Sequence, residues 1–204
     1  MDGLIPHARV LRVHRAHAGA RRRSLSLPVR ELVDLASWAT DEARQRAGAD
    51  EGERLIEALA EELHQAAADA RTRGPVTALS YVPEPHLGEL ARIELSALVT
   101  DDTYPTMTVD LLHRYLAAST DISFRPPEAE LRTLPAGPAV RVRHAYVQDA
   151  DRDGTGTVME TCAYGIVPDE KWGLVLLTSW QALAHTDALC ALTDSLARTV
   201  TVTS

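Results

Sequence analysis

The stretch DADRDGTGTVME, residues 149–160, has residue types and a spacing that suit a calcium ion. An EF-hand loop supplies oxygen ligands at alternating positions, a glycine at its sharp bend and a bidentate glutamate at its end. This stretch matches that pattern throughout. The residues that would supply the oxygens are Asp149, Asp151, Asp153, Thr155 and Glu160. Calcium binding through residues 149–160 is therefore one function that the sequence permits.

The segments on either side of this loop argue against calcium. Residues 139–148 and 157–167 alternate apolar and polar side chains with a period of two, which is typical of strands, whereas an EF-hand requires a helix on each side. Asp-Gly supplies the positive φ that a tight hairpin connection needs. We therefore expect a hairpin without a functional metal, with Glu160 pointing sideways from a strand. Calcium binding stays an alternative.

A second distinctive feature is the triplet Arg21, Arg22 and Arg23. Residues 1–30 carry seven arginines and one acidic residue, although the whole chain has a net charge of −8. This basic segment can dock on the acidic body of its own chain or meet an anionic partner. The overall acidity disfavours nucleic acid. We expect the partner to be another protein.

No catalytic signature emerges from the sequence. There is no G-x-S-x-G motif, no phosphate-binding loop and no dinucleotide fingerprint. Cys162 and Cys190 are too few for a disulfide framework, and buried free thiols are the expected state. Cys162 can lie near His144 if their strands are neighbours, but a thiol packed in the core is favoured. We assign no catalytic residue and no cofactor.

The elements that must position these residues follow from hydrophobic periodicity. We predict one helix from Pro28 to about residue 47. A second follows the linker 47–53 and ends at Arg73, with Leu55, Leu59 and Leu63 on its apolar face. A third covers 108–119, with Leu111, Leu112, Tyr115 and Leu116 facing inward, and a last one is capped by Thr186. The predicted strands cover 8–14, 76–82, 91–100, the short stretches DISFRP and AELRTLP, 139–148, 157–167, 172–180 and the terminal TVTVT. Residues 139–180 are expected to form a three-stranded meander.

These elements predict an α+β fold: an antiparallel β-sheet with an N-terminal helical hairpin and flanking helices. We expect residues 1–204 to form a single domain, in which 1–75 hold a strand and the helical hairpin and 76–204 form a strand-rich part with two short helices. No run approaches the ~18 apolar residues that a membrane span needs. The sequence thus predicts a soluble, cytoplasmic protein.

The segment LRTLPAGPAVRVRHAYVQ, with TCAYGIVPDEKWGLVLLTSW and LTDSLARTVTV after it, resembles actinobacterial proteins of uncharacterised function. Their C-terminal halves are similar to the Mog1/PsbP-like α+β fold. The shared features are a Leu-Pro-Ala-Gly lead-in at 134–137, an arginine-bearing strand at 141–143, Tyr164 followed by Pro168, and a final helix that enters a closing strand. The resemblance covers residues 76–204 and implies a binding or accessory role. It transfers no functional residue.

The sequence therefore predicts a non-enzymatic partner-binding or accessory protein. Its contact surface is expected in the Arg-rich segment 12–23, together with the edge of the sheet. One alternative is a small-molecule-binding protein or enzyme with a pocket between sheet and helices, and another is the calcium-binding protein described above. Self-association is left open.

Overall fold

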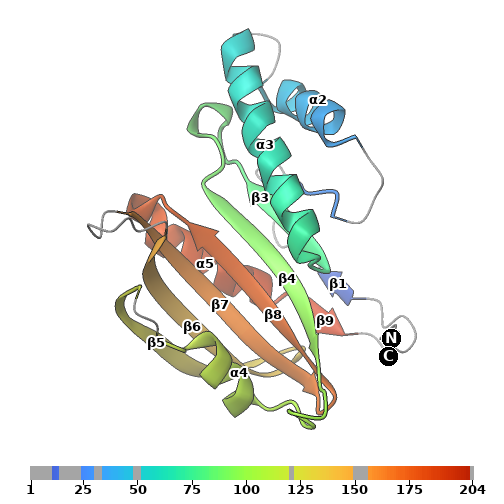
Figure 1. The fold of residues 1–204 in the computed structure, drawn as a ribbon, viewed down its shortest axis with the longest axis vertical. Coiled ribbons are helices and arrows are strands. Elements are labelled where there is room, and N and C mark those ends of the chain that lie inside the picture. Colours follow the sequence, from blue (N-terminus) through green and yellow to red (C-terminus); the bar gives the residue numbers. More distant parts are fainter. Residues whose placement is uncertain are drawn as a thin grey trace.

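The computed structural model describes residues 11–13, 24–29, 34–47, 52–119, 122–148 and 156–202. Within these residues the chain has an α+β fold, built on an antiparallel sheet of seven strands in the order β2-β3-β4-β8-β7-β6-β5 (Figure 1). The strands of this sheet are β2 (Ser24–Ser26), β3 (Thr77–Tyr81), β4 (Ala91–Val99), β5 (Ser123–Leu134), β6 (Gly137–Gln148), β7 (Thr157–Asp169) and β8 (Trp172–Trp180).

The remaining elements flank this sheet. The helices are α2 (Leu35–Ala47), α3 (Glu53–Arg73), α4 (Val109–Leu116) and α5 (Thr186–Ala197), with short 3₁₀ turns at η1 (Pro85–Leu87) and η2 (Leu183–His185). A separate two-stranded ladder joins β1 (Leu11–Val13) to β9 (Val200–Val202), which brings the two ends of the described chain together. None of the described helices has the length and apolar character to cross a bilayer.

The meander predicted for residues 139–180 is confirmed. Strands β6 and β7 pair from Ala139 opposite Ile166 to Gln148 opposite Thr157, and β8 pairs with the other edge of β7. Because side chains alternate between the faces of a strand, every second residue of each strand points to the same layer. The register therefore decides which side chains of 139–180 meet.

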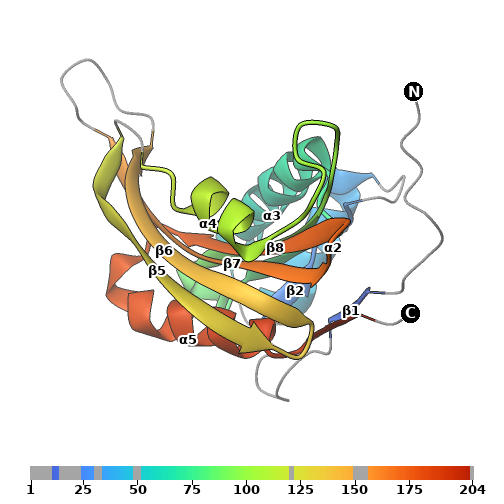
Figure 2. The same cartoon turned by 90° about the horizontal axis from the view of Figure 1, so that it is seen from below.

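Helices α4 and α5 cover opposite faces of this sheet (Figure 2). On the α5 face, Leu189 and Leu196 of the helix join the main buried cluster of the sheet. The Nε of Arg141 in β6 donates to Asp194 of α5 at 2.8 Å, which adds an ion pair to this packing. On the other face, Leu112 of α4 packs against the sheet beside Gly165 of β7, where a Cβ would lie 2.8 Å from that leucine. Gly165 thus allows α4 to approach closely.

The predicted N-terminal helical hairpin is confirmed as a helix pair. Leu59 and Leu63 of α3 are buried against small residues of α2, among them Ala39 and Ala43. Helix α3 ends at Gly74, whose left-handed conformation (φ 63°) lets its backbone N–H donate to the Ala70 carbonyl. The pair lies beside β3 at the β2 end of the sheet, far from β5 (Figure 1).

The start of α2 was predicted too early. Pro28 lies outside the helix, which begins at Leu35; the N–H of Leu27 still donates to the Ala78 carbonyl of β3 at 2.9 Å, and the N–H of Val29 donates back to the Leu27 carbonyl at 2.9 Å. Asp34 provides the cap instead, since its Oδ1 accepts from the Ala36 N–H at 3.1 Å. A good capping side chain further along the chain thus determined where the helix starts.

Three local predictions also need correction. The two short strands predicted as DISFRP and AELRTLP are replaced by one strand, β5 (Ser123–Leu134), that runs through Pro126 and Pro127. A strand at the edge of a sheet tolerates proline because its outer N–H groups bond to no neighbour. Tyr115 was expected to face inward but is 65% exposed, because α4 is short and only Leu112 lies fully over the sheet. Thr186 is not the cap of α5, since the capping position is His185.

Candidate functional site

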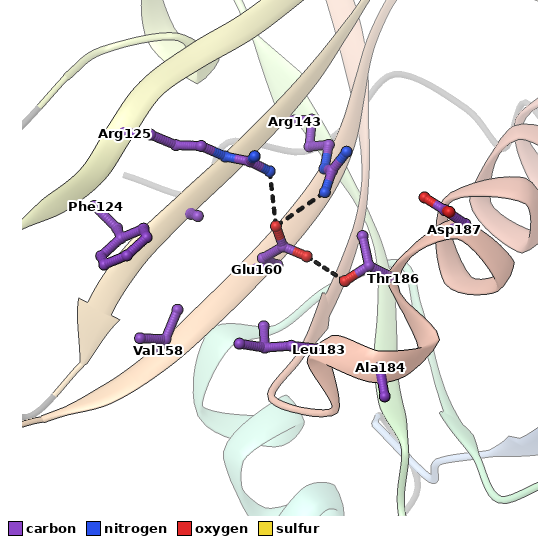
Figure 3. A pocket seen from close by; sticks show the side chains of 10 residues that line it. Phe124, Arg125, Arg143, Val158, Glu160, Leu183, Ala184, Thr186 and Asp187 are labelled. Atoms are coloured by element: carbon purple, nitrogen blue, oxygen red, sulfur yellow. Dashed lines mark hydrogen bonds and ion pairs between the residues drawn. The ribbon is translucent and has the colours of Figure 1, made fainter.

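A cavity of about 330 Å³ lies at one end of the sheet, where β5, β6 and β7 meet the start of α5 (Figure 3). Its size falls at the small end of the range for ligand pockets. Apolar side chains contribute one part of its lining, namely Phe124, Val158 and Leu183, with the last on η2. The other part is charged and is contributed by Arg125, Arg143, Glu160 and Asp187.

The strand register brings the charged residues together. Glu160 of β7 lies opposite Ala145 of β6, so Arg143, two residues from Ala145, points to the same face beside Glu160. Arg125 joins Arg143 and Glu160 from β5. The pairing of β5 with β6 shifts register on both sides of Arg125. Such irregularities bend a strand and change the direction in which its side chains point. Thr186 arrives from the opposite layer, in the first turn of α5.

Glu160 is the centre of the resulting network. Its Oε1 accepts hydrogen bonds from the Nη2 atoms of Arg125 at 2.7 Å and Arg143 at 3.1 Å. Its Oε2 accepts from the hydroxyl of Thr186. That hydroxyl in turn accepts from the indole Nε1 of buried Trp180 at 3.1 Å. Both carboxylate oxygens are therefore bonded, although the Glu160 side chain is only 8% exposed.

The network determines the charge of the site. Burial alone would raise the pKa of Glu160, but hydrogen bonds from Thr186 and Arg143, with the charges of Arg143 and Arg125, outweigh it, so this pKa lies below its usual range. Glu160 is thus ionised at neutral pH. Two guanidinium groups share this one buried carboxylate, and Arg125 also forms an ion pair with the exposed Glu128 at 3.9 Å. Asp187 lies on the exposed first turn of α5, where its charge also suits the helix dipole.

Arg143 keeps an unused donor. Its Nε is buried and has no hydrogen-bond partner within the part of the chain that the structure describes. Arginine carries five N–H donors in a planar fork, and a buried donor without a partner costs free energy. The Arg143 side chain lines the cavity and is 23% exposed, and a carboxylate fits the fork of a guanidinium group with two bonds.

The calcium prediction is tested only in part. Asp149, Asp151, Asp153 and Thr155 lie outside the described residues. The segments around them are strands, as the periodicity predicted. Glu160, the last residue of the motif, points both oxygens at Arg125, Arg143 and Thr186, so it is unsuited to wrap around an ion in the loop. The prediction that residues 149–160 hold no functional metal stays a prediction.

The other expectations have mixed outcomes. Arg21, Arg22 and Arg23 lie outside the described residues. Cys162 and Cys190 are free and buried, as expected. A hydrogen bond with Cys190 and burial raise the pKa of the Cys162 thiol, which keeps that thiol protonated.

His144 and Cys162 do not form a pair, although their strands are neighbours. Cys162 lies opposite Arg143 and therefore faces α5, whereas His144 is one residue further along β6 and points to the other face. The Nε2 of His144 instead lies 2.9 Å from the Ser123 hydroxyl.

Sequence reasoning missed Arg125, Arg143 and Thr186 as site residues and gave Glu160 only a minor role. One signal was present: Arg141 and Arg143 are two apart in a predicted strand, so both point to the same face of the sheet. A pair of charges on a buried face requires partners. The sequence did not reveal that those partners are Asp194 and Glu160.

Comparisons with known proteins add little. No protein-family model matches the chain, and no curated protein matches it. Among solved structures, LpqN, which is involved in cell envelope biogenesis of Mycobacterium tuberculosis, is similar with a TM-score of 0.45 and 15% sequence identity, over 65% of this chain and 75% of LpqN. At this level the similarity carries no conclusion about the function of this chain.

Proposed function

We propose that the protein binds a small organic carboxylate with an apolar body in the cavity between β5, β6, β7 and the start of α5. The observation that carries this proposal is the pair of arginines that line the cavity and share one carboxylate, of which Arg143 has a buried Nε without a partner among the described residues. The carboxylate would bond to the guanidinium groups of Arg125 and Arg143. The apolar body would lie against Phe124, Val158 and Leu183.

A binding role fits this site better than a catalytic one. The Thr186 hydroxyl already donates to Glu160 and accepts from Trp180. The Glu160 carboxylate already accepts hydrogen bonds from three donors. A general base must be free to take a proton, and the lowered pKa of Glu160 makes it a weak one. The Mog1/PsbP-like resemblance, which we retain as part of the proposal, implies a binding or accessory role as well.

Heteronuclear NMR tests the proposal with octanoate and phenylacetate as probes. We expect both to shift the Nε–Hε resonance of Arg143 and the amide resonances around Phe124 and Leu183, with saturation. Octanamide and phenylacetamide are the matched neutral controls and should cause much smaller shifts. Equal shifts with acid and amide, or no saturable shift with any probe, would refute a carboxylate site.

Two variants locate the binding. Arg125→Gln removes one guanidinium while leaving Glu160 paired with Arg143, and it should weaken octanoate binding by about tenfold, given the free energy of a charge-assisted hydrogen bond. Ala184→Phe places a ring at the exposed edge of the cavity and leaves the ion pairs intact. It should weaken octanoate more than acetate. Octanoate affinity unchanged in both variants would place the probe elsewhere.

A protein partner for Arg21, Arg22 and Arg23 remains a second proposal, favoured by the basic charge of residues 1–30 in an acidic chain. Its test is affinity capture from the native host with wild-type protein and with all three arginines changed to glutamate. Loss of specific partners in the variant supports the proposal, and identical partner lists refute it. The cytoplasmic location also remains a prediction, which cell fractionation checks.

A further inference from the structure

Strand β5 ends the sheet, and its second half has an exposed outer edge. β5 is the last strand in the sheet order and pairs on one side with β6. From Glu128 to Leu134 the register with β6 is regular, and all residues from Glu128 to Thr133 are exposed. The backbone N–H and C=O groups along such an edge can pair with another strand. Figure 2 shows β5 at the margin of the described sheet.

The first half of β5 is protected against such pairing, but the second half is not. Pro126 and Pro127 lack N–H donors, and the register shifts on either side of Arg125 interrupt the ladder there. From Glu128 to Leu134 the strand has no proline and no register shift. At the middle of this stretch lies Leu131, a large apolar side chain that is 72% exposed.

The charged residues of Glu128–Leu134 are arranged so that two antiparallel copies of this stretch complement each other. Glu130 and Arg132 flank Leu131, lie on the same face of β5 and form an ion pair within the strand. If two copies of the stretch are placed antiparallel with Leu131 opposite Leu131, each Glu130 lies opposite the Arg132 of the other copy. Ala129 then lies opposite Thr133, and Glu128 opposite Leu134. No like charges meet, and cross-strand pairs of opposite charge stabilise a sheet.

We propose that a second copy of this chain pairs with β5 along residues Glu128–Leu134, so that Leu131 lies on the two-fold axis of a homodimer. The contact is isologous, because the same residues form both sides. The two sheets join into one continuous antiparallel sheet. On the α4 face, each Leu131 side chain becomes buried against the Leu131 of the other copy. The Glu130–Arg132 ion pairs between the two copies form on the opposite face.

The contact is small and the dimer is therefore in exchange with monomer. One short strand pair buries less surface than a permanent dimer requires, and exposed ion pairs add little each. Backbone hydrogen bonds and the Leu131 pair supply most of the stability. The complementary charges determine the register and the partner.

Charge exchange tests the proposal by sedimentation velocity over a wide range of protein concentrations. Wild type should show a reversible monomer–dimer equilibrium. Glu130→Arg places two arginines opposite two arginines, and Arg132→Glu places two glutamates opposite two glutamates. Each variant alone should dissociate about tenfold more readily than wild type, because like charges directly opposite are unfavourable.

Mixing the two variants provides the decisive control. In a mixed pair, both arginines of one chain face both glutamates of the other, so a heterodimer should form at least as tightly as the wild-type dimer. The double variant Glu130→Arg, Arg132→Glu restores complementarity and should dimerise like wild type. Far-UV circular dichroism confirms that each variant is folded, which is expected because both side chains are about half exposed.

Three outcomes would overturn the proposal: a monomeric wild type at every concentration, single variants that dimerise like wild type, or a mixture that behaves like its separate components. Hydrogen exchange provides a second measurement that needs no substitution. The amides of residues 128–134 that are not bonded to β6 should become protected as the concentration of wild type rises. Protection elsewhere with none in this stretch would place the dimer contact on another surface.

Discussion

The two halves of β5 differ in what they present to their surroundings. In the first half, two prolines and two register shifts carry Arg125 to the α5 face, where it meets the buried carboxylate of Glu160. In the second half, the ladder with β6 is regular and the side chains from Glu128 to Thr133 are exposed. One strand thus lines the cavity at one end and has an open edge at the other.

This difference shows how irregular pairing separates two roles on one strand. A bulge changes which side chains face inward and interrupts the row of backbone groups that another strand could use. A regular ladder retains that row on the outer side. Substitutions in the first half of β5 should therefore affect folding stability and ligand binding, whereas substitutions in the second half should affect self-association.

The largest effect is expected for Glu160→Leu, which leaves Arg125 and Arg143 without their shared carboxylate. Removal of one partner from a buried ion pair typically costs about 3–5 kcal/mol, so the free energy of unfolding should fall by about that amount. Urea unfolding followed by tryptophan fluorescence measures it. Glu130→Leu is the matched control in the exposed half, at a protein concentration low enough to keep the chain monomeric, and there the loss should be under about 1 kcal/mol. Equal losses in both variants would contradict the division of β5.

Gly137→Ala should have the next largest effect. Gly137 has φ 139° at the turn between β5 and β6, and an added Cβ would lie 2.3 Å from the Val167 carbonyl oxygen. The backbone must shift, and we expect a loss of about 2 kcal/mol in the free energy of unfolding. Thr133→Ala, nearby in the exposed stretch, should lose under about 0.5 kcal/mol. Urea midpoints of the two variants test this, and a near-neutral Gly137→Ala would show that the turn can adapt.

The pH dependence of stability sharpens the role of Glu160. Because the pKa of Glu160 is lowered in the folded protein, its ionised form stabilises the fold above the pKa of the unfolded chain. This contribution is lost as the pH falls through the folded-state pKa. Wild type should therefore lose more stability than Glu160→Gln between neutral and acidic pH, as measured by urea midpoints at each pH. Parallel profiles would mean that Glu160 is not held ionised by its arginines.

The smallest effect is expected from the exposed pair Glu130 and Arg132. Both side chains are about half exposed, so Arg132→Ala should change the free energy of unfolding by less than about 0.5 kcal/mol. Thermal unfolding at a protein concentration low enough to keep the chain monomeric measures this change. A large loss would mean that the pair supports the fold itself, and the charge-exchange experiment would then need variants at Leu131.

Sequence reasoning succeeded where a short stretch of chain carried the signal. The alternation in 139–148 and 157–167 predicted β6 and β7 correctly, and this separated a hairpin from an EF-hand although the loop matched the calcium motif. Leu59 and Leu63 likewise predicted the buried face of α3. Reasoning was less successful where two local signals competed, as at the start of α2, where Pro28 was a plausible first residue but Asp34 is the cap.

The sequence by itself determined the types of the elements and the faces of most strands, because a period of two or of about 3.6 is a property of consecutive residues. Only the tertiary structure decided that Arg125, Arg143, Glu160 and Thr186 converge and that β5 is an edge. Those facts depend on strand order, register and the docking of α5. Such long-range contacts join residues far apart in the chain, and no local pattern of side chains specifies them.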